Sequence, residues 1–381
     1  MEGNSSTALP EMMACMLGYE ICHEPWAFYY DETENCRLIR YGERGIVDPR
    51  TMERDFILGG IALTDPSVYE TMAQGVRKLP QASGEAKASA VLSTSDNFLY
   101  VLKRRELTDF LQLIDRPGVL VHYRTQNNFY YSIVDIVDSV IPLSNGKEIL
   151  GQLHRELKDV MYACVADDRT AFINSLMRFG YPNIAADQVQ PFCSYLEDVL
   201  ASAAESNPLL ATPDKRLLVN ALKHMLRTAS ETNSLVFLEG NDENILVSGF
   251  SAHYQLTCMS FPMALHCFDN ETHISMSLLD TSYNYKFVDS KAEPLVQLAD
   301  VWVGLLSRLF RFLDEYSTSP NPRHINPNAA RVQLENLATI KRLIDRADET
   351  HKALISNCSP ISTIVRRYRT LEKLCDLRQQ P

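Results

Sequence analysis

Long apolar runs are missing from this chain, and its first residues do not resemble a leader. No apolar run approaches the roughly 18 residues needed to cross a bilayer, so a transmembrane helix is not expected. The opening MEGNSSTALPEMMACMLGYE has no basic start and contains Pro10 and Glu11, which argues against a signal peptide. We therefore expect a cytoplasmic protein without membrane association.

Cysteine pairs and metal-ligand spacings are also missing. The nine cysteines are scattered along the chain, and no Cys-x-x-Cys or zinc-finger spacing occurs. An odd and unpatterned set of cysteines is typical of reduced thiols in the cytosol. Neither a disulfide framework nor a structural zinc site is expected.

The common catalytic motifs are absent as well. The sequence has no G-x-x-x-x-G-K-[ST], G-x-G-x-x-G, G-x-S-x-G or H-E-x-x-H segment. The histidines do not cluster; His122, at a predicted strand end, is the one worth following, and packing is its expected role. The net charge of −11 excludes a protein that coats nucleic acid through its overall field. It does not exclude a nuclease that uses carboxylates and metal ions.

What the chain does have is the composition and patterning of a globular α/β protein, with 45% hydrophobic and 22% charged residues. Apolar or alternating runs predict strands at 26–31, 36–41, 55–63, 119–124, 263–269 and 284–290. Asp65 and Pro66 mark a helix start, and a second helical stretch covers about 96–115. Strands and helices in this order favour a mixed sheet.

A long helical block interrupts the strands. Apolar residues at three-to-four spacing predict helices from about 127 to 232, followed by a short strand at 234–240 and a further helix at 243–261. We therefore predict four parts: a first part of the core at 20–126, an inserted helical subdomain at 127–260, a second part of the core at 261–316, and a helical C-terminal extension at 317–381.

Three of the predicted strands end in an acid, namely Asp31, Asp269 and Asp289. Strand ends in α/β sheets face crevices that bind ligands, so these carboxylates could converge, although aspartate also simply caps turns. Carboxylates that meet raise each other's pKa, and divalent metals relieve that repulsion. Mg²⁺ prefers such ligands, and two ions about 4 Å apart clamp the oxygens of a phosphodiester.

Two further groups stand out. In GEAKAS, Glu85 and Lys87 would share one side of an extended segment, as metal ligand and phosphate contact or as a surface salt bridge. In the helix predicted after residue 290, a helical wheel places six residues on one face: Gln297, Asp300, Gly304, Ser307, Arg308 and Arg311. That face is either exposed to solvent or turned toward the acids. Gly304 lowers helix stability by about 1 kcal/mol relative to Ala, but it allows another backbone or a ligand to approach the helix closely.

Several segments together resemble a known family. YYDETEN, GEAKAS and FVDSKAEPLVQLADVWVG are similar to the signature segments of the prokaryotic family called domain of unknown function 3800. The sequence departs from that pattern where Thr33 and Glu34 replace Ser and Gly, and where Ala88 replaces Gly. The resemblance implies a ribonuclease H-like fold with acids arranged as in metal-dependent nucleases.

The resemblance also implies roles for particular residues. Asp31, Glu85, Asp269 and Asp300 would hold Mg²⁺ or Mn²⁺, with Lys87 beside the phosphate and Glu32, Asp289, Ser290 and Gln297 in support. The leading hypothesis is a metal-dependent nuclease acting on RNA or DNA, in which Asp300 lies within metal-bridging reach of Asp31. Two alternatives remain. One is a non-catalytic subunit, for example of a phage-defence system, that binds a protein partner through the helical insertion or the tail. The other is a hydrolase of small phosphate esters.

Overall fold

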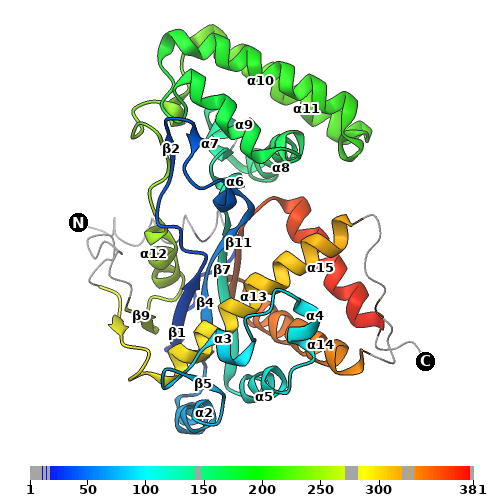
Figure 1. Ribbon diagram of the computed structural model, residues 1–381. Helices are drawn as coiled ribbons and strands as arrows, with labels where there is room; N and C mark the ends of the chain where they lie inside the picture. Colours follow the sequence, from blue (N-terminus) through cyan, green and yellow to red (C-terminus); the bar gives the residue numbers. More distant parts are fainter. Residues whose placement is uncertain are drawn as a thin grey trace.

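The core of the protein is one mixed sheet of six strands in the order β10-β9-β1-β4-β7-β11. The computed structural model (Figure 1) describes residues 11, 14, 18–141, 147–270, 282–319, 325 and 330–377. The core strands are β1 (Ala27–Thr33), β4 (Asp55–Leu63), β7 (Val119–Asn127), β9 (Leu265–Asp269), β10 (Tyr285–Val288) and β11 (Ile355–Cys358). The predicted mixed sheet is therefore confirmed.

The first three long strands form an antiparallel meander, and the later strands join it in parallel. β1 pairs antiparallel with β4, and β4 pairs antiparallel with β7. β9 runs parallel to β1, β10 parallel to β9, and β11 parallel to β7. β4 and β7 are almost wholly buried, which explains why β4 is a near-continuous apolar run rather than an alternating one. The second half of β7, from Arg124 to Asn127, is polar although it is buried.

The long helix α13 (Pro294–Thr318) lies directly on β1 and β4. It can do so because Gly60 has no side chain: a Cβ there would stand 2.6 Å from the Cβ of Ala299 and 2.0 Å from the carbonyl oxygen of Tyr29. α12 (Ser251–Ser260) packs on the opposite face, where the Tyr254 ring lies 5.0 Å from that of Phe268. The sheet is thus covered on both faces.

Shorter elements surround α13. Asp65 caps η2 (Pro66–Val68) by accepting a hydrogen bond from the Ser67 amide at 2.9 Å, which confirms the predicted helix start. The others on this side are α2 (Tyr69–Val76), β5 (Gln81–Ala82), β6 (Glu85–Ala86), α3 (Ala88–Val91), α4 (Phe98–Leu102) and α5 (Arg105–Ile114). None of the helices in the described ranges is both long and apolar enough to span a membrane.

The helical block stands at the top of Figure 1, above the sheet. It contains α6 (Asn128–Tyr131), α7 (Val134–Val140), α8 (Lys147–Val165), α9 (Arg169–Leu176), η3 (Met177–Phe179), α10 (Ala186–Ser206), η4 (Pro208–Leu210), α11 (Pro213–Thr232) and η5 (Val236–Leu238). The helices predicted for 127–232 are therefore present, but the strand predicted at 234–240 is wrong, because η5 occupies that segment.

A second, small sheet joins the block to the core. Its order is β3-β2-β8, formed by β2 (Ile39–Gly42), β3 (Gly45–Ile46) and β8 (Ile245–Val247), with η1 (Pro49–Glu53) following. The strand predicted at 36–41 thus belongs to this sheet rather than to the core. The single helix predicted at 243–261 is also wrong: Gly249, with a φ of 147°, separates β8 from α12.

The C-terminal segment is more than a helical extension. It contributes α14 (Arg331–Thr350), η7 (Lys352–Leu354) and α15 (Ile361–Asp376), but also β11, which pairs with β7. Asp159 of α8 accepts hydrogen bonds from the amide and hydroxyl of Ser362 at 2.9 and 2.7 Å, at the start of α15. The all-helical tail predicted for 317–381 needs correction, because this segment completes the sheet and contacts the helical block.

Candidate active site

Asp31, Asp269 and Asp300 meet at the C-terminal end of β1. Tyr30 pairs with Phe268 in the parallel ladder, so the next residues, Asp31 and Asp269, are neighbours on adjacent strands. Burial, followed by the charges of Asp300, Glu32 and Asp269, raises the pKa of Asp31 well above its usual range. Burial also raises the pKa of Asp300, to which the charges of Asp269 and Glu85 add. The three carboxylates therefore repel one another in a partly desolvated place.

Backbone amides orient these carboxylates. The Ala88 amide donates to Asp300 Oδ2 at 2.7 Å, and the Glu32 amide donates to Asp31 Oδ1 at 2.7 Å. The Asn270 amide donates to Asp269 Oδ1 at 2.8 Å. The side chain of Asp300 is thus directed at the start of α3 and not at bulk water, and the polar face of α13 is turned inward at this point.

Glu85 and Lys87 form an ion pair beside the three acids. Ser290 Oγ donates to Glu85 Oε2 at 2.7 Å, and Lys87 Nζ lies 3.1 Å from the same oxygen. Burial alone would raise the pKa of Glu85, but the contacts with Ser290 and Lys87 outweigh it and lower that pKa. Burial would lower the pKa of Lys87, yet Glu85, Asp300 and Asp31 together raise it. Both groups are therefore held in their charged forms.

The buried amide of Gln297 joins the segments that carry this ion pair. Its Oε1 accepts a hydrogen bond from the Ala86 amide at 2.9 Å, and its Nε2 donates to the Ser290 carbonyl at 2.7 Å. Gln297 is only 6% exposed, so neither bond competes freely with water. One side chain thus fixes β6 and the turn after β10 relative to α13.

Other residues singled out by the sequence lie elsewhere. Glu32 points to the opposite face of the sheet, as expected from strand alternation, and accepts a hydrogen bond from the Tyr254 hydroxyl at 3.1 Å. Asp289 is exposed, and its Oδ1 accepts from the Lys291 amide at 2.9 Å, so it caps a turn. His122 is buried against Tyr30, and burial lowers its pKa to about 3. His122 therefore packs as a neutral ring.

Gly304 permits α13 to approach α3. A Cβ at Gly304 would lie 2.9 Å from the Cβ of Ala88, closer than two methyl groups can stand. The Ala88 amide is the donor to Asp300, so this contact sets the position of a carboxylate as well as of a helix. The close approach predicted for Gly304 is confirmed.

Gly304→Ala is expected to destabilise the protein, and Ala88→Gly to restore part of the loss. Overpacking costs about 1–3 kcal/mol, which exceeds the gain of about 1 kcal/mol from replacing a helical glycine. Urea unfolding of the two single variants and the double variant gives the coupling energy. Purely additive effects, or a Gly304→Ala variant as stable as wild type, would contradict the contact.

The acids do not form a ready-made coordination shell. Within the described ranges, no three His, Cys, Asp or Glu side chains are placed so that together they could hold one metal ion. One oxygen of Asp31 and one of Asp300 are engaged by backbone amides, as described above. These two amide bonds leave the second oxygen of each carboxylate, Asp31 Oδ2 and Asp300 Oδ1, for other contacts.

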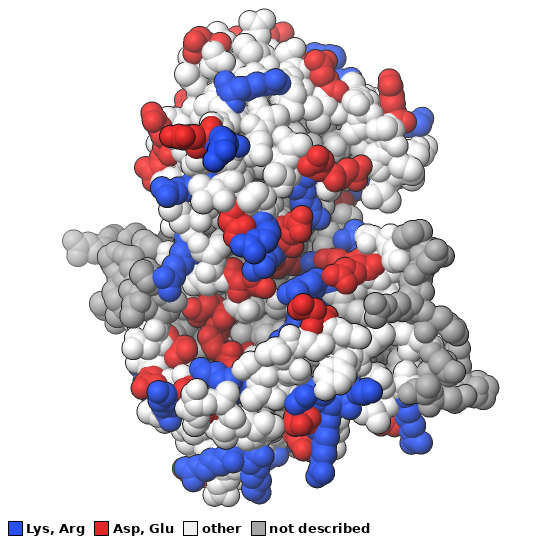
Figure 2. All heavy atoms as spheres, viewed as in Figure 1, with Lys and Arg blue, Asp and Glu red and all other residues white. Residues whose placement is uncertain are grey.

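A groove leads away from Asp300. A cavity of about 730 Å³ is lined by Asp300, Gly304, Ser307, Arg308 and Arg311, which are the members of the predicted polar face beyond Gln297. Asp and Glu side chains gather in a hollow in the middle of the face shown in Figure 2, with Lys and Arg side chains next to them. The polar face of α13 therefore lines a groove and is not an ordinary solvated surface.

One residue at this groove is strained. Glu34, directly after β1, has a φ of 55°, a left-handed conformation that costs a residue other than glycine about 1–3 kcal/mol. It stands where the resemblance leads one to expect Gly, so the tight turn is kept despite the substitution. No sequence pattern pointed to a role for Glu34, because its ion-pair partners Arg54 and Arg311 lie 20 and 277 positions away.

The segments that carry the resemblance come together in space. The end of β1, β6 and the first half of α13 surround the same three carboxylates. Comparison of the chain with models of protein families, with curated proteins and with solved structures finds no match.

Proposed function

We propose that this protein is a Mg²⁺- or Mn²⁺-dependent nuclease with a ribonuclease H-like core. The observation that carries the proposal is the convergence of Asp31, Asp269 and Asp300 at the C-terminal end of β1, where the charges of Asp300 and Asp269 add to the raised pKa of Asp31 and the charge of Asp269 adds to that of Asp300. Within the described part of the chain, Lys87 is the one cation that these interactions bring to the three acids, and clustered carboxylates are the donor set that hard divalent cations prefer. Three carboxylates that come together from two strands and a helix favour a metal site over a purely structural role for these side chains.

The residues would divide the work as follows. Asp31, Asp269 and Asp300 would hold the metal, which when bound activates water and polarises a phosphoryl oxygen. Lys87 supplies a fixed positive charge next to them for the phosphate. Glu85, expected from the sequence as a further ligand, contacts Lys87 and Ser290, and these contacts favour a role in orienting Lys87. Gln297 and Ser290 hold this pair in place.

The direct test is cleavage. Purified protein with Mn²⁺ is incubated with single-stranded, double-stranded and hybrid RNA and DNA, with Asp300→Asn as the control. Cleavage of at least one substrate by the wild type alone supports the proposal. Equal cleavage by both proteins would show that the activity does not come from this site.

Metal binding can be tested without any substrate. Mn²⁺ should raise the melting temperature, since a ligand at 100 times its Kd stabilises the native state by about 2.7 kcal/mol. Asp31→Asn should abolish the shift, whereas Asp289→Asn, which alters only an exposed turn cap, should keep it. Calorimetry or dye-based melting measures both. An Asp31→Asn shift as large as that of wild type would favour the alternative of a non-catalytic, partner-binding protein.

A further inference from the structure

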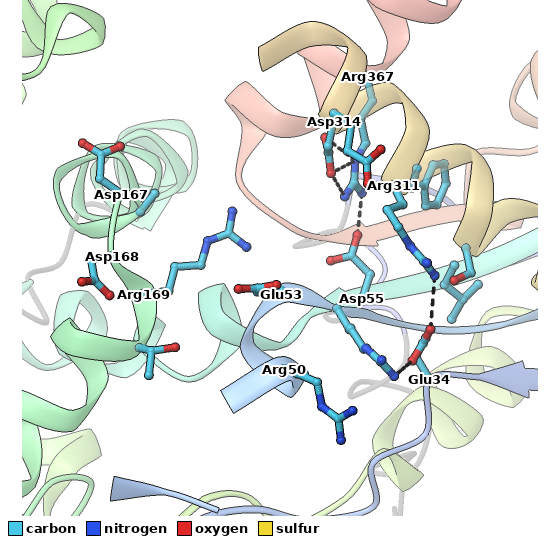
Figure 3. A pocket seen from close by; sticks show the side chains of 17 residues that line it. Glu34, Arg50, Glu53, Asp55, Asp167, Asp168, Arg169, Arg311, Asp314 and Arg367 are labelled. Carbon is cyan, nitrogen blue, oxygen red and sulfur yellow. Dashed lines mark hydrogen bonds and ion pairs between the residues drawn. The ribbon is translucent and has the colours of Figure 1, made fainter. Parts of the chain in front are cut away.

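Two cavities adjoin along α13. The cavity of about 730 Å³ starts at Asp300 and ends near Phe312 and Tyr316. A second cavity of about 590 Å³ lies between η1, α13 and the start of α9, which belongs to the helical block (Figure 3). Four residues line both: Glu34, Ser307, Arg311 and Glu315. The two cavities therefore form one continuous groove, called here the α13 groove.

Glu34 holds two arginines at the junction of the cavities. Its Oε2 lies 2.6 Å from Arg54 Nη1, and its Oε1 lies 3.7 Å from Arg311 Nη2 (Figure 3). The side chains of Arg54 and Arg311 are 49% and 52% exposed, whereas Glu34 is 17% exposed. The two arginines come from separate elements, a loop before β4 and α13, and converge on a single anionic group.

We propose that Arg54 and Arg311 bind a backbone phosphate of a single nucleic-acid strand, and that Glu34 occupies the position of this phosphate when the strand is absent. This names the substrate class of the site and rests on the nuclease function proposed above. Guanidinium groups bind carboxylate and phosphate in the same geometry, so one anion can replace the other. The left-handed backbone of Glu34 is a conformation that costs a residue other than glycine about 1–3 kcal/mol, and Glu34 is the residue whose carboxylate reaches both arginines.

Other charged residues in the groove are less suited to this role. Arg367 is bound to Asp55 at 2.6 Å and to Asp314 at 2.5 Å, and Arg50 is bound to Asp48 at 3.0 Å. Asp96 and Glu315 also line the groove, so it is not basic throughout. Arg308 and Arg169 also line it, but each donates to backbone carbonyls: Arg308 to Leu92 and Ser95, and Arg169 to Met52. Arg54 and Arg311 differ from these arginines because they converge on one anionic group.

The length of the groove indicates a polymer. Asp300 and Arg311 are eleven residues apart on one helix, which corresponds to about 16 Å at 1.5 Å per residue. A strand stacked with the rise of B-DNA, about 3.4 Å per nucleotide, covers that distance in about five nucleotides. The partly exposed rings of Phe312 and Tyr316, with centroids 5.7 Å apart, line the groove and suit stacking by unpaired bases. A single strand fits these features better than a mononucleotide or a duplex.

The test is binding in the presence of EDTA, which separates it from cleavage. Fluorescence anisotropy with labelled single strands of about 20 nucleotides, four times the span estimated above, compares four proteins. Arg311→Ala should bind about tenfold more weakly and lower the slope of log K against log salt by about 0.7. Glu34→Gln should bind several-fold more tightly. Arg105→Ala, which removes a 91% exposed arginine outside the groove, should stay within twofold of wild type.

Glu34→Gly serves as a second variant, because glycine accepts the backbone angle and removes the same charge. Unchanged or weaker binding of the single strand by both Glu34 variants would overturn the inference. So would a finding that Arg311→Ala weakens the binding of a duplex or a dinucleotide as much as it weakens the binding of the single strand. If binding fails this pattern while wild type cuts and Asp300→Asn does not, the nuclease proposal stands and the groove assignment is wrong. If binding follows the pattern but wild type cuts no substrate, the groove assignment stands and the nuclease proposal is wrong.

Discussion

Asp300→Asn is expected to lower metal-dependent cleavage by about 10²- to 10³-fold, the size of effect seen when one group that stabilises a charged transition state is removed. The amide oxygen can still accept the hydrogen bond from the Ala88 amide, so α13 and α3 keep their contact. What is lost is a negative charge next to Asp31 and Asp269. Initial rates with Mn²⁺ and the substrate identified for wild type measure the change.

Asp31→Asn should show the same loss without any loss of stability. The pKa of Asp31 is raised in the folded state, so ionisation lowers the stability of the metal-free protein. That penalty begins as the pH rises past the unfolded value of about 3.9 and is complete above the raised folded value. Asn removes it, and the metal-free variant should melt no lower than wild type at pH 7.5.

Asp289→Asn is the matched control for both substitutions. It makes the same chemical change at an acid that follows a neighbouring strand but only caps a turn. Its cleavage rate should stay within about twofold of wild type, since surface changes away from a site usually cost less than 0.5 kcal/mol. A control that lost activity as severely as Asp300→Asn would mean that the three converging acids have been wrongly assigned.

Arg367→Ala is expected to cause the largest loss of stability, about 3–5 kcal/mol, because it leaves a buried carboxylate without its partner. Arg367 Nη1 lies 2.6 Å from Asp55 Oδ2 and Nη2 lies 2.5 Å from Asp314 Oδ2, and the side chains of Arg367 and Asp55 are only 12% and 7% exposed. These contacts join α15 to the start of β4 and to α13. Equilibrium unfolding in urea measures the loss.

Arg369→Ala is the appropriate comparison for Arg367→Ala. It lies two residues further along α15 and is exposed, so it should change stability by less than about 0.5 kcal/mol. If Arg367→Ala were equally mild, the contacts of α15 with β4 and α13 would contribute little to stability. A large difference between the two variants would instead establish α15 as part of the core.

The parts of the fold that were predicted correctly have strong local signals. β4 and the first half of β7 are apolar runs whose burial on both faces is expected from their composition. β11 was missed because its residues, Ile-Ser-Asn-Cys, have little strand character of their own and become a strand by pairing with β7. The pairing of Arg367 with Asp55 spans 312 positions, a distance at which sequence patterns carry no information.

In the candidate site, too, the features with a local sequence signal were predicted and those that depend on distant residues were not. Helical periodicity placed Asp300 and Gly304 on one face but could not tell whether that face met water or protein. The answer depends on Ala88, which donates its amide to Asp300 and packs on Gly304, and which comes from a segment more than two hundred positions away. Strand-end acids were equally ambiguous: Asp269 joins Asp31, whereas Asp289 caps a turn.

The strand order has a consequence for how copies of the chain behave toward one another. β7 is buried at every position, and without β11 it would present unpaired backbone N–H and C=O groups to which another chain could add a strand. β11 covers that edge with a four-residue strand containing Ser356 and Asn357. At the other end, β10 is equally short and carries the exposed Lys286. Both margins of the sheet are thus short and polar or charged, which protects the folded protein against self-association through strand addition.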